Sequence, residues 1–425
     1  MKSWIKNFNE LSTTHNRKLA LTIAEAGLDA ISTEGAVFRS VKLHDNLLSV
    51  AGTSFDLSKF KKIKVIGFGK ASGDGALALE KILGSKIKEG AIIGITKANC
   101  QYIETFAGTH PRPSQMNVEA GKRIYEIIKN SDKEDLIIVL VSGGGSALLC
   151  YSAIECTQNM TLYDEFLKSG KTITEINTVR KHLSILKGGG LAKIAYPATV
   201  IGLIFSDIAG DNFENVASGP TYKDRTVIVD AEKIVAENNL GKFDLIETIK
   251  EDKYFENVHN FVMVSNQTAI EAMKQKSEEL GLSAKILSTE MYDEVGTVLK
   301  KIFGAKKDNI VVLGAGEPRL EVKKNSGIGG RNLHMGLQAI KEKLIDEKSV
   351  FISLASDGVD NSNAAGAVVD KDTIEKAKKL NLSAEDYLAK FDSYNFFKKS
   401  GDLIKTGPTG ANVADLMILL TKYEK

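Results

Sequence analysis

Cysteine is scarce in this chain of 425 residues, which holds only Cys100, Cys150 and Cys156. An odd count without regular spacing is no disulfide framework, and no Cys and His cluster has the spacing of a zinc site. Charge of one sign is also lacking, since 56 Lys and Arg side chains are balanced by 54 Asp and Glu side chains. Nucleic-acid binding needs a strongly basic face, so we expect no nucleic acid as partner.

Long hydrophobic runs are absent as well. The longest, such as Leu136–Val141 and Thr199–Phe205, have the length of strands and are too short to span a bilayer. The first residues, Met1–Glu10, contain no apolar stretch of the kind found in a signal peptide. We therefore expect a cytoplasmic protein without a membrane partner.

Three familiar catalytic motifs are missing too. The string Glu165–Thr172 lacks the first glycine of a Walker A loop, and Gly144–Leu148 ends in leucine where a nucleophile elbow needs glycine. In Gly67–Ser72 the third glycine of a dinucleotide fingerprint is replaced by serine. These absences count against a P-loop, a serine hydrolase and a nicotinamide enzyme.

What the chain does contain is a regular alternation of short apolar runs with amphipathic stretches. Continuous apolar runs are typical of strands buried on both faces, as in a parallel sheet covered by helices, so we expect the α/β class. The expected strands are Ile63–Gly67, Ala91–Ile95, Leu136–Val141, Ala198–Phe205, Phe261–Val264, Ala284–Leu287, Ile310–Leu313 and Val350–Leu354. The expected helices include Arg17–Ile31, Ser114–Ile128, Gln267–Leu280 and Asn332–Leu344.

The length predicts two domains, because one hydrophobic core rarely serves so many residues. Apolar residues make up 43% of the chain, enough for sizeable cores. The stretch Asp224–Glu256 is polar with a helical pattern, and we place a boundary near its end. The expected domains are therefore residues 1–255 and 256–425.

Two glycine-rich loops follow strands in the first half. Gly67–Gly73 carries Lys70 where a strand turns into a helix, a place at which backbone N–H groups and a cation can meet an anion. The second loop can form a nest of N–H and O–H donors for phosphate oxygens. Its residues are Ser142, Gly143, Gly144, Gly145 and Ser146. The alternative for both loops is an ordinary tight turn.

A basic stretch comes next. Asn177, Arg180 and Lys181 lie three and four residues apart, so a helix would place them on one face. They precede a glycine loop made of Lys187, Gly188 and Gly189. A basic face beside such a loop suits phosphate, although a solvated helix face is an equal alternative.

Further polar residues follow later strands. Asp207 and Asp211 end one strand, and hard carboxylate oxygens there suit Mg²⁺ or a catalytic base. Arg331 stands at a glycine-rich helix entry, where it can stabilise a phosphoryl group or grip a carboxylate. Asp357 and Thr409 lie in two more loops of the C-terminal half. Together these groups predict a cleft between the domains.

In these segments the chain resembles the class II glycerate kinases, whose C-terminal half is the MOFRL fragment. The resemblance covers nearly the whole chain in one order. It rests on Gly67–Ala71, Thr109–Pro113, Ser142–Leu148, Asn177–Leu191, Ser206–Asp211, Ala217–Thr221, Gly316–Pro318, Gly329–Asn332, Asp357–Ala367 and Thr406–Asn412.

The resemblance implies ATP-dependent phosphorylation of D-glycerate with Mg²⁺ or another divalent cation. It implies a Rossmann-like N-terminal domain with a mostly parallel sheet and a smaller C-terminal α/β domain with a mixed sheet. Lys70 and Arg331 match the lysine and arginine used near the transferred phosphate. The product would be 2-phosphoglycerate, as in the non-phosphorylative or branched Entner–Doudoroff pathway.

We accordingly expect a D-glycerate 2-kinase. Lys70, Arg331 and Asp207 would be catalytic, and the two glycine loops would bind phosphates. Asn177, Arg180, Asp211 and Thr409 would bind substrate, and Asp207 and Asp357 would bind the metal. The alternatives are an NAD(P)H-dependent hydroxypyruvate reductase and a non-catalytic phosphosugar-binding module. A homodimer is an option that the sequence leaves open.

Overall fold

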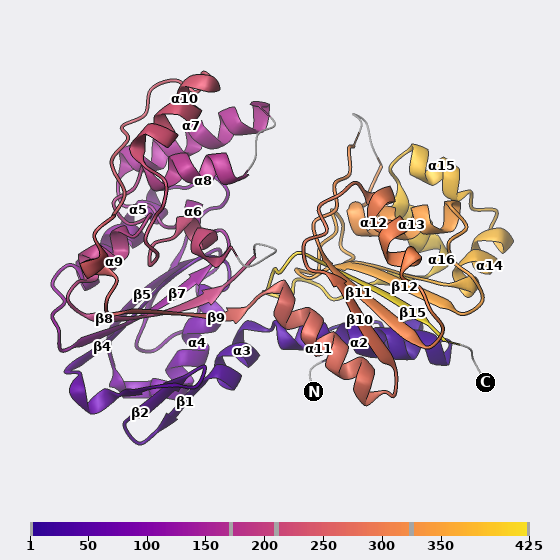
Figure 1. Cartoon of the computed structure of the whole chain (residues 1–425), viewed down its shortest axis with the longest axis horizontal. Coiled ribbons are helices and arrows are strands. Elements are labelled where there is room, and N and C mark those ends of the chain that lie inside the picture. Colours follow the sequence, from indigo (N-terminus) through magenta and orange to yellow (C-terminus); the bar gives the residue numbers. More distant parts are fainter. Residues whose placement is uncertain (1–2, 170–172, 208–211, 323–326, 423–425) are drawn as a thin grey trace. The chain divides into compact units, whose positions relative to one another are not determined.

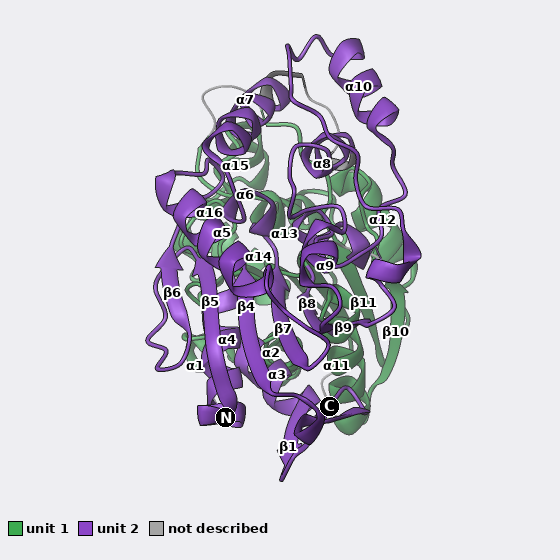
Figure 2. Ribbon diagram, turned by 90° about the vertical axis from the view of Figure 1, so that its left-hand side faces the viewer, with its two compact units in different colours: residues 1–32, 207–211, 264–425 green, residues 33–206, 212–263 purple. Residues whose placement is uncertain are grey.

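The computed structural model describes residues 3–169, 173–207, 212–322 and 327–422. The chain forms two compact units, coloured separately in Figure 2. Unit 1 comprises Met1–Ser32, Asp207–Asp211 and Val264–Lys425, and unit 2 comprises Thr33–Ser206 and Asn212–Met263. This grouping differs from a division at residue 255 because the first 32 residues pack with the C-terminal half.

Unit 2 is built on a six-stranded sheet of order β6-β5-β4-β7-β8-β9. The pairs β6–β5, β5–β4, β4–β7 and β7–β8 are parallel, which confirms the expected parallel sheet. Each residue of β7 is buried, as its unbroken apolar run predicts. The strands are β4 (Lys62–Phe68), β5 (Ile87–Gly94), β6 (Glu104–Ala107), β7 (Asp135–Ser142), β8 (Thr199–Phe205) and β9 (Val258–Val264).

Helices cover both faces of this sheet (Figure 1). α4 (Ser72–Leu83) lies on one face with α3 (Thr33–Ser40) and a small antiparallel sheet, and α5 (Gln115–Ile128) and α9 (Gly190–Ala195) lie on the other. The small sheet is β1 (Val41–His44), β2 (Leu47–Val50) and β3 (Thr53–Asp56). The remaining helices are α6 (Gly145–Leu148), α7 (Ala153–Ser169), α8 (Ile173–Lys181) and α10 (Ile228–Glu237).

Unit 1 contains a second six-stranded sheet, of order β10-β11-β15-β12-β13-β14. Only β10 and β11 pair in parallel, and the other neighbours are antiparallel, so the sheet is mixed as expected. Its strands are β10 (Ser283–Ser288), β11 (Ile310–Gly316), β12 (Ser349–Ala355), β13 (Gly366–Val369), β14 (Leu403–Ile404) and β15 (Asp415–Thr421).

Two helices that lie far apart in the sequence cover one face of this sheet (Figure 1). They are α2 (His15–Ala30) and α11 (Asn266–Glu279). The other face carries α12 (Val295–Gly304), α13 (Arg331–Lys341), α14 (Lys371–Lys379), α15 (Ala384–Ala389) and α16 (Ser393–Ser400). A short helix, α1 (Phe8–Leu11), precedes α2, and four 3₁₀ turns occur at Leu57–Lys59, Gly84–Lys86, Phe213–Ser218 and Asp252–Tyr254.

The stretch Asp224–Glu256 departs from the expectation. Only α10 and the turn Asp252–Tyr254 are helical there, so the prediction of a helical stretch is wrong for the residues between them. Those residues are instead bound to other loops by backbone hydrogen bonds. The N–H groups of Ile246 and Ile249 donate to the carbonyl oxygens of His182 and Gly188. Among the described helices, none is long and apolar enough to cross a membrane.

Candidate active site

In unit 2 the loops that follow β4 and β7 touch each other closely. Gly69 has φ +112°, and a Cβ atom there would lie 2.2 Å from Oγ of Ser142, so only glycine fits. Ser142 Oγ accepts from the N–H of Ala71 at 3.1 Å, and the N–H of Lys70 donates to the carbonyl of Gly143 at 2.9 Å. The Ser142 hydroxyl therefore joins the two loops, and the backbone of Lys70 lies beside the second loop.

The second loop presents backbone donors. Within the described part of the chain, none of the N–H groups from Gly143 to Ser146 has an acceptor. Such groups are expected at the start of a helix, here α6, and they attract anions. Ser146 Oγ lies 2.9 Å from Oγ of Ser218, which also donates to Oδ1 of Asn177 at 3.4 Å. The loop is thus a nest of N–H groups edged by hydroxyls.

His110, to which the sequence analysis gave no role, lies next to this nest. The amide of Asn117 binds the N–H of Thr109 at 3.0 Å and the carbonyl of Ala147 at 3.2 Å, and so joins the two segments. A Cβ atom on Gly144 would lie 3.3 Å from both Nε2 of His110 and Cγ of Lys70. Burial, then the charges of Lys70 and Arg180, lower the pKa of His110 to about 4. The imidazole is therefore neutral at pH 7.

Arg180 differs from the other buried Lys and Arg residues in the way its charge is paired. The buried Lys and Arg residues in the described ranges are Arg17, Lys64, Arg180, Lys181 and Lys187. Four of them contact a carboxylate within 3.0 Å: that of Asp370, Asp135, Asp224 or Glu155. Arg180 has no such partner among the described residues, and its Nε is buried without a hydrogen bond.

Burial without a counter-ion among the described residues has a physical consequence for Arg180. It lowers the pKa of the guanidinium to about 10, which is still high enough to keep the charge at pH 7. A buried cation without a partner is strongly unfavourable in a folded protein. Since Lys70 adds a second positive charge beside the same His110, this part of unit 2 is suited to bind an anion.

Three other predicted phosphate ligands, Lys187, Gly188 and Gly189, form hydrogen bonds within the protein. Lys187 Nζ donates to Oε1 of Glu155 at 2.6 Å and to the carbonyl of Leu149 at 2.7 Å. The N–H groups of Gly188 and Gly189 donate to the carbonyls of residues 218 and 219. Lys181, on the same helix as Arg180, is bound to Asp224. The donors open to a ligand are therefore concentrated in the Gly143–Ser146 loop.

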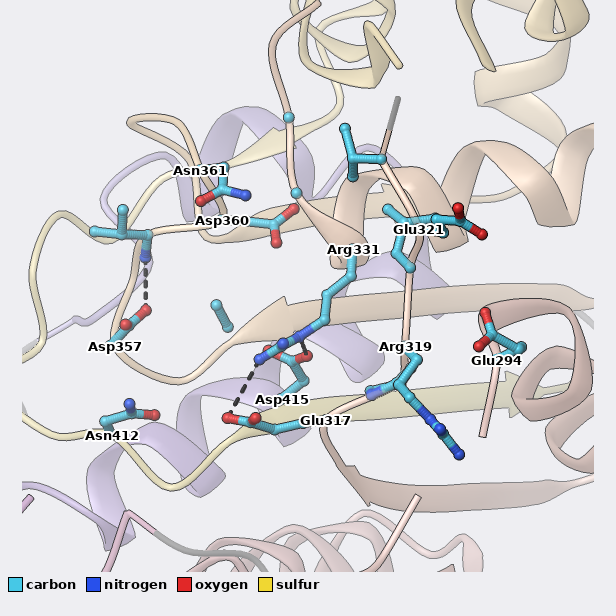
Figure 3. A pocket seen from close by; sticks show the side chains of 17 residues that line it. Glu294, Glu317, Arg319, Glu321, Arg331, Asp357, Asp360, Asn361, Asn412 and Asp415 are labelled. Carbon is cyan, nitrogen blue, oxygen red and sulfur yellow. Dashed lines mark hydrogen bonds and ion pairs between the residues drawn. The ribbon is translucent and has the colours of Figure 1, made fainter. Parts of the chain in front are cut away.

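Unit 1 has a pocket of its own, of about 620 Å³, above the ends of β11, β12 and β15. Figure 3 shows it from close by, with Arg331 extending toward Asp415 and Glu317. Polar side chains dominate its lining. They are Glu294, Glu317, Arg319, Glu321, Arg331, Asp357, Asp360, Asn361, Asn412 and Asp415.

Arg331 is held by two carboxylates. Its Nε forms an ion pair with Oδ2 of Asp415, and its Nη2 lies 3.3 Å from Oε1 of Glu317. The Arg331 side chain is 35% exposed, whereas that of Asp415 is 3% exposed. Burial opposes the charge of Arg331, but the two carboxylates outweigh this effect and raise its pKa. Arg331 therefore carries a permanent charge into the pocket.

The N-terminus of α13 is already occupied by a carboxylate of the protein. Asp360 accepts from the N–H of Asn332 at 3.2 Å and from the N–H of Leu333 at 2.8 Å. A Cβ atom on Gly330 would lie 2.2 Å from Oδ1 of Asp360, which explains glycine before the helix. Burial raises the pKa of Asp360. A phosphate at this pocket would thus meet Arg331 and not the helix end.

The predicted metal ligands are only partly described. Asp357 lines the unit 1 pocket, and its Oδ1 accepts from the N–H of Val359 at 2.9 Å. Thr409 lies in the neighbouring loop, with its hydroxyl donating to Ser356 at 2.6 Å. Asp207 follows β8 and is half-buried, and Asp211 lies outside the described residues. No cluster of three or more metal-binding side chains occurs within the described ranges.

The donor set around Asp357 is chemically suited to a hard cation. Carboxylate and amide oxygens from Asp357, Asn361 and Asn412 line the same pocket. Mg²⁺ takes one or two carboxylates and completes its shell with water and phosphate oxygens, so it does not need a cage of three protein ligands. The residues present therefore fit a magnesium ion that arrives with a nucleotide.

Comparison with known proteins gives the family. Residues 19–250 match a domain of unknown function, DUF4147, and residues 310–415 match the MOFRL family. The chain is 33% identical to glycerate 2-kinase of Pyrococcus horikoshii, over 96% of this chain and 98% of that one. It is 31% identical to D-glycerate 2-kinase of Thermotoga maritima, over 95% and 97%.

A solved structure agrees with the sequence matches. The crystal structure of glycerate kinase from Thermotoga maritima superposes with a TM-score of 0.84 at 31% identity, over 95% of this chain and 99% of that one. Both family matches, the relatives and the fold thus agree over nearly the full length. The chain belongs to the glycerate kinase family in which a DUF4147 domain is followed by a MOFRL domain.

Proposed function

We propose that this protein transfers the γ-phosphoryl group of ATP to the 2-hydroxyl of D-glycerate. The observation that carries the proposal is the buried guanidinium of Arg180, which has no carboxylate partner among the described residues and whose charge, like that of Lys70, acts on His110 beside an open nest of N–H groups. Two such cations and a nest suit a substrate that is itself an anion and a co-substrate that is a polyphosphate. The names of the relatives supply glycerate as the substrate, and the word kinase in those names supports ATP as the co-substrate.

Each group has a distinct role in this proposal. Arg180, supported by Asn177 on the same helix, binds the carboxylate of D-glycerate, because a guanidinium matches a carboxylate in geometry and charge. The backbone N–H groups of Gly143–Ser146 bind phosphate oxygens of ATP. Lys70 and Arg331 neutralise charge that develops on the transferred phosphoryl group, the main task of a phosphoryl-transfer enzyme.

His110 and the magnesium ion complete the proposal. The neutral imidazole of His110 accepts a hydrogen bond from a substrate hydroxyl, which a protonated ring could not do. Asp357, with Asp207 as a further candidate, would hold Mg²⁺, which neutralises phosphate charge when it is bound. Thr409 positions the loop beside Asp357 through its hydrogen bonds. The product, 2-phosphoglycerate, is the one that the Entner–Doudoroff variants named above require.

A coupled assay of ADP release with D-glycerate, ATP and Mg²⁺ tests this function. The expected result is turnover that depends on all three, with 2-phosphoglycerate as the product in phosphorus NMR. Formation of 3-phosphoglycerate would keep the kinase and overturn the position of transfer. Lack of ADP release, together with quenching or enhancement of nicotinamide fluorescence on mixing with NADPH, would favour a reductase instead.

The role of Lys70 can be tested with two lysines at opposite ends of one strand. Lys70→Ala should lower kcat by about 10²- to 10³-fold, the usual effect of removing one charge-stabilising group. Lys61→Ala, a matched control just before β4, removes a lysine that is 71% exposed and should leave kcat unchanged. Normal turnover by the Lys70 variant would remove this residue from the mechanism.

A further inference from the structure

The ion pair between Arg331 and Asp415 raises a question that the proposed function leaves open. Asp415 is the first residue of β15, and its side chain is almost completely buried. Burial raises the pKa of Asp415 to about 7, although Arg331 and Asn332 act in the opposite direction. Ionising a carboxylate that is so deeply buried opposes folding, so stability alone does not explain an aspartate at this position.

The contacts of Asp415 show what it does to Arg331. Oδ2 binds Nε of the guanidinium, and Oδ1 accepts from Nδ2 of Asn332 at 2.8 Å. Asn332 is fixed in turn, because its Oδ1 accepts from Oγ of Ser353 at 2.6 Å. Both partners of the carboxylate thus belong to α13, and Ser353, which holds Asn332, belongs to β12.

This arrangement controls the direction of the guanidinium. An arginine has five N–H donors in one plane, and Asp415 accepts a hydrogen bond from the Nε edge of Arg331. The Nη atoms point away from that edge, toward Glu317 and the pocket (Figure 3). Because Glu317 is 45% exposed and 3.3 Å away, its hold is weaker than that of Asp415.

We propose that Asp415 is a positioning residue that fixes Arg331 through its Nε edge, so that the Nη edge is presented to an anion in the unit 1 pocket. This inference rests on the proposed function, in which that anion is the transferred phosphoryl group. The charged groups facing Asp415 are Arg331 from α13 and Asp360 from the loop after β12. Glu317, after β11, reaches the same guanidinium.

Protonation of Asp415 removes the ionic part of this hold. Activity should therefore fall as the pH decreases through about 7, in wild type but not in a variant that cannot titrate there. Asp415→Asn keeps the shape of the side chain and loses the charge. We expect it to lower kcat by about 10²-fold at pH 8, as small misplacements of a catalytic group do. KM for D-glycerate should change less than threefold.

Two controls separate positioning from folding. Glu347→Gln removes an exposed carboxylate that pairs with Lys371, and should leave kcat and its pH profile as in wild type. Asp415→Asn should not lower the melting temperature at pH 8, because the fold disfavours the charged form that it removes. A large fall in melting temperature with wild-type kcat, or an unchanged acid limb of the profile, would overturn the inference.

A second readout does not depend on turnover. In protein labelled with ¹⁵N-arginine, the Nε–H signal of Arg331 is identified by its absence in Arg331→Lys. We expect slow exchange of this proton with water at pH 8 in wild type and fast exchange in Asp415→Asn. Equal exchange in both proteins would overturn the positioning role. Slow exchange in wild type without any kinase activity would keep it and refute the proposed function alone.

Discussion

At the scale of single residues, the site is marked by how charges are paired. Arg17 and Arg180 are both buried arginines, but Arg17 contacts Asp370 and Asp402, whereas Arg180 has no carboxylate among the described residues. Because burial lowers the pKa of Arg180 to about 10, its charge lowers the free energy of unfolding by about 3 kcal/mol. A cost of this size is a large part of the net stability of a domain, which supports the ligand-binding role proposed for Arg180.

Replacing Arg180 by methionine should therefore separate stability from function. We expect Arg180→Met to raise the free energy of unfolding by about 1–3 kcal/mol, because a flexible apolar side chain fills the space without a charge. The same variant should lower kcat/KM for D-glycerate by at least about 10²-fold. Urea unfolding and steady-state kinetics measure the two effects.

The matched control is Arg225→Met, since the Arg225 side chain is 86% exposed in the same unit. This variant should change neither stability nor kcat/KM. A loss of stability in Arg180→Met would show that Arg180 packs for structural reasons, and full activity would remove it from the substrate site.

At the scale of elements, replacing a buried arginine by methionine should change the free energy of unfolding in the opposite direction when the arginine is paired, as Arg17 is. Arg17 on α2 binds both Asp370, which caps α14, and Asp402 before β14, at distances from 2.6 to 2.8 Å. Arg17→Met would leave the buried carboxylate of Asp370 without its cationic partner and that of Asp402 with Lys376 alone. We expect it to lower the free energy of unfolding by about 3–5 kcal/mol. The neighbouring Lys18 is exposed, and Lys18→Met should be neutral in the same urea titration.

The sign of the pH effect follows from Asp370. Burial disfavours its charged form, but Arg17 and the hydrogen bonds outweigh this, so its pKa is lowered. The stabilisation from this pair is therefore present near neutral pH and is lost as the pH falls through the lowered pKa. The destabilisation by Arg17→Met should shrink in acid, and an effect that stayed constant would contradict the ion-pair origin.

Most strands of the two large sheets could be predicted from their apolar runs. All eight expected runs coincide with strands, most of them buried on both faces, although β9 and β10 are partly exposed. The fully buried β15 was not among the expected strands. The hairpin β1–β3 has short strands that are partly exposed, and the pattern there is too weak. Asp224–Glu256 has helical periodicity, yet beyond α10 its backbone is bound to other loops at Ile246 and Ile249, which only tertiary structure reveals.

The site was predictable only in part for a similar reason. Lys70, Arg180 and Arg331 stand out because glycine-rich loops or a basic helix surround them. That Arg180 lacks a carboxylate among the described residues while Lys181 and Lys187 have one is a property of packing and has no trace in the sequence. His110 lies in the Thr109–Pro113 segment of the resemblance, but nothing in that segment predicts a role for it. Asp415 was missed because Arg331 and Asn332, its partners, lie far away in sequence.

At the scale of the whole molecule, the two ends of the chain fold together. Residues 3–32 belong to unit 1, where α2 packs against β12 and β15 and beside α11. The family matches begin only at residue 19 and end at residue 415, so the first segment is easily taken for an optional extension. The structure makes it one wall of the unit 1 core.

Deletion of residues 1–32 should therefore damage unit 1 more than unit 2. We expect hydrogen exchange to become fast in β12 and β15, while β4 and β7 keep their protection, because their sheet lies in the other unit. Mass spectrometry of deuterated fragments resolves the two sheets. Equal loss of protection in both would mean that the units fold as one, and no loss would mean that α2 is dispensable.

The unpaired charge of Arg180 also bears on how long the protein survives between encounters with its substrate. A ligand that supplies the missing negative charge binds only the folded state, and so lowers the population of unfolded chains in proportion to its concentration. Proteases in a cell act on that population. With the substrate role proposed for Arg180, we expect the protein to resist proteolysis longer when D-glycerate is present than when it is absent.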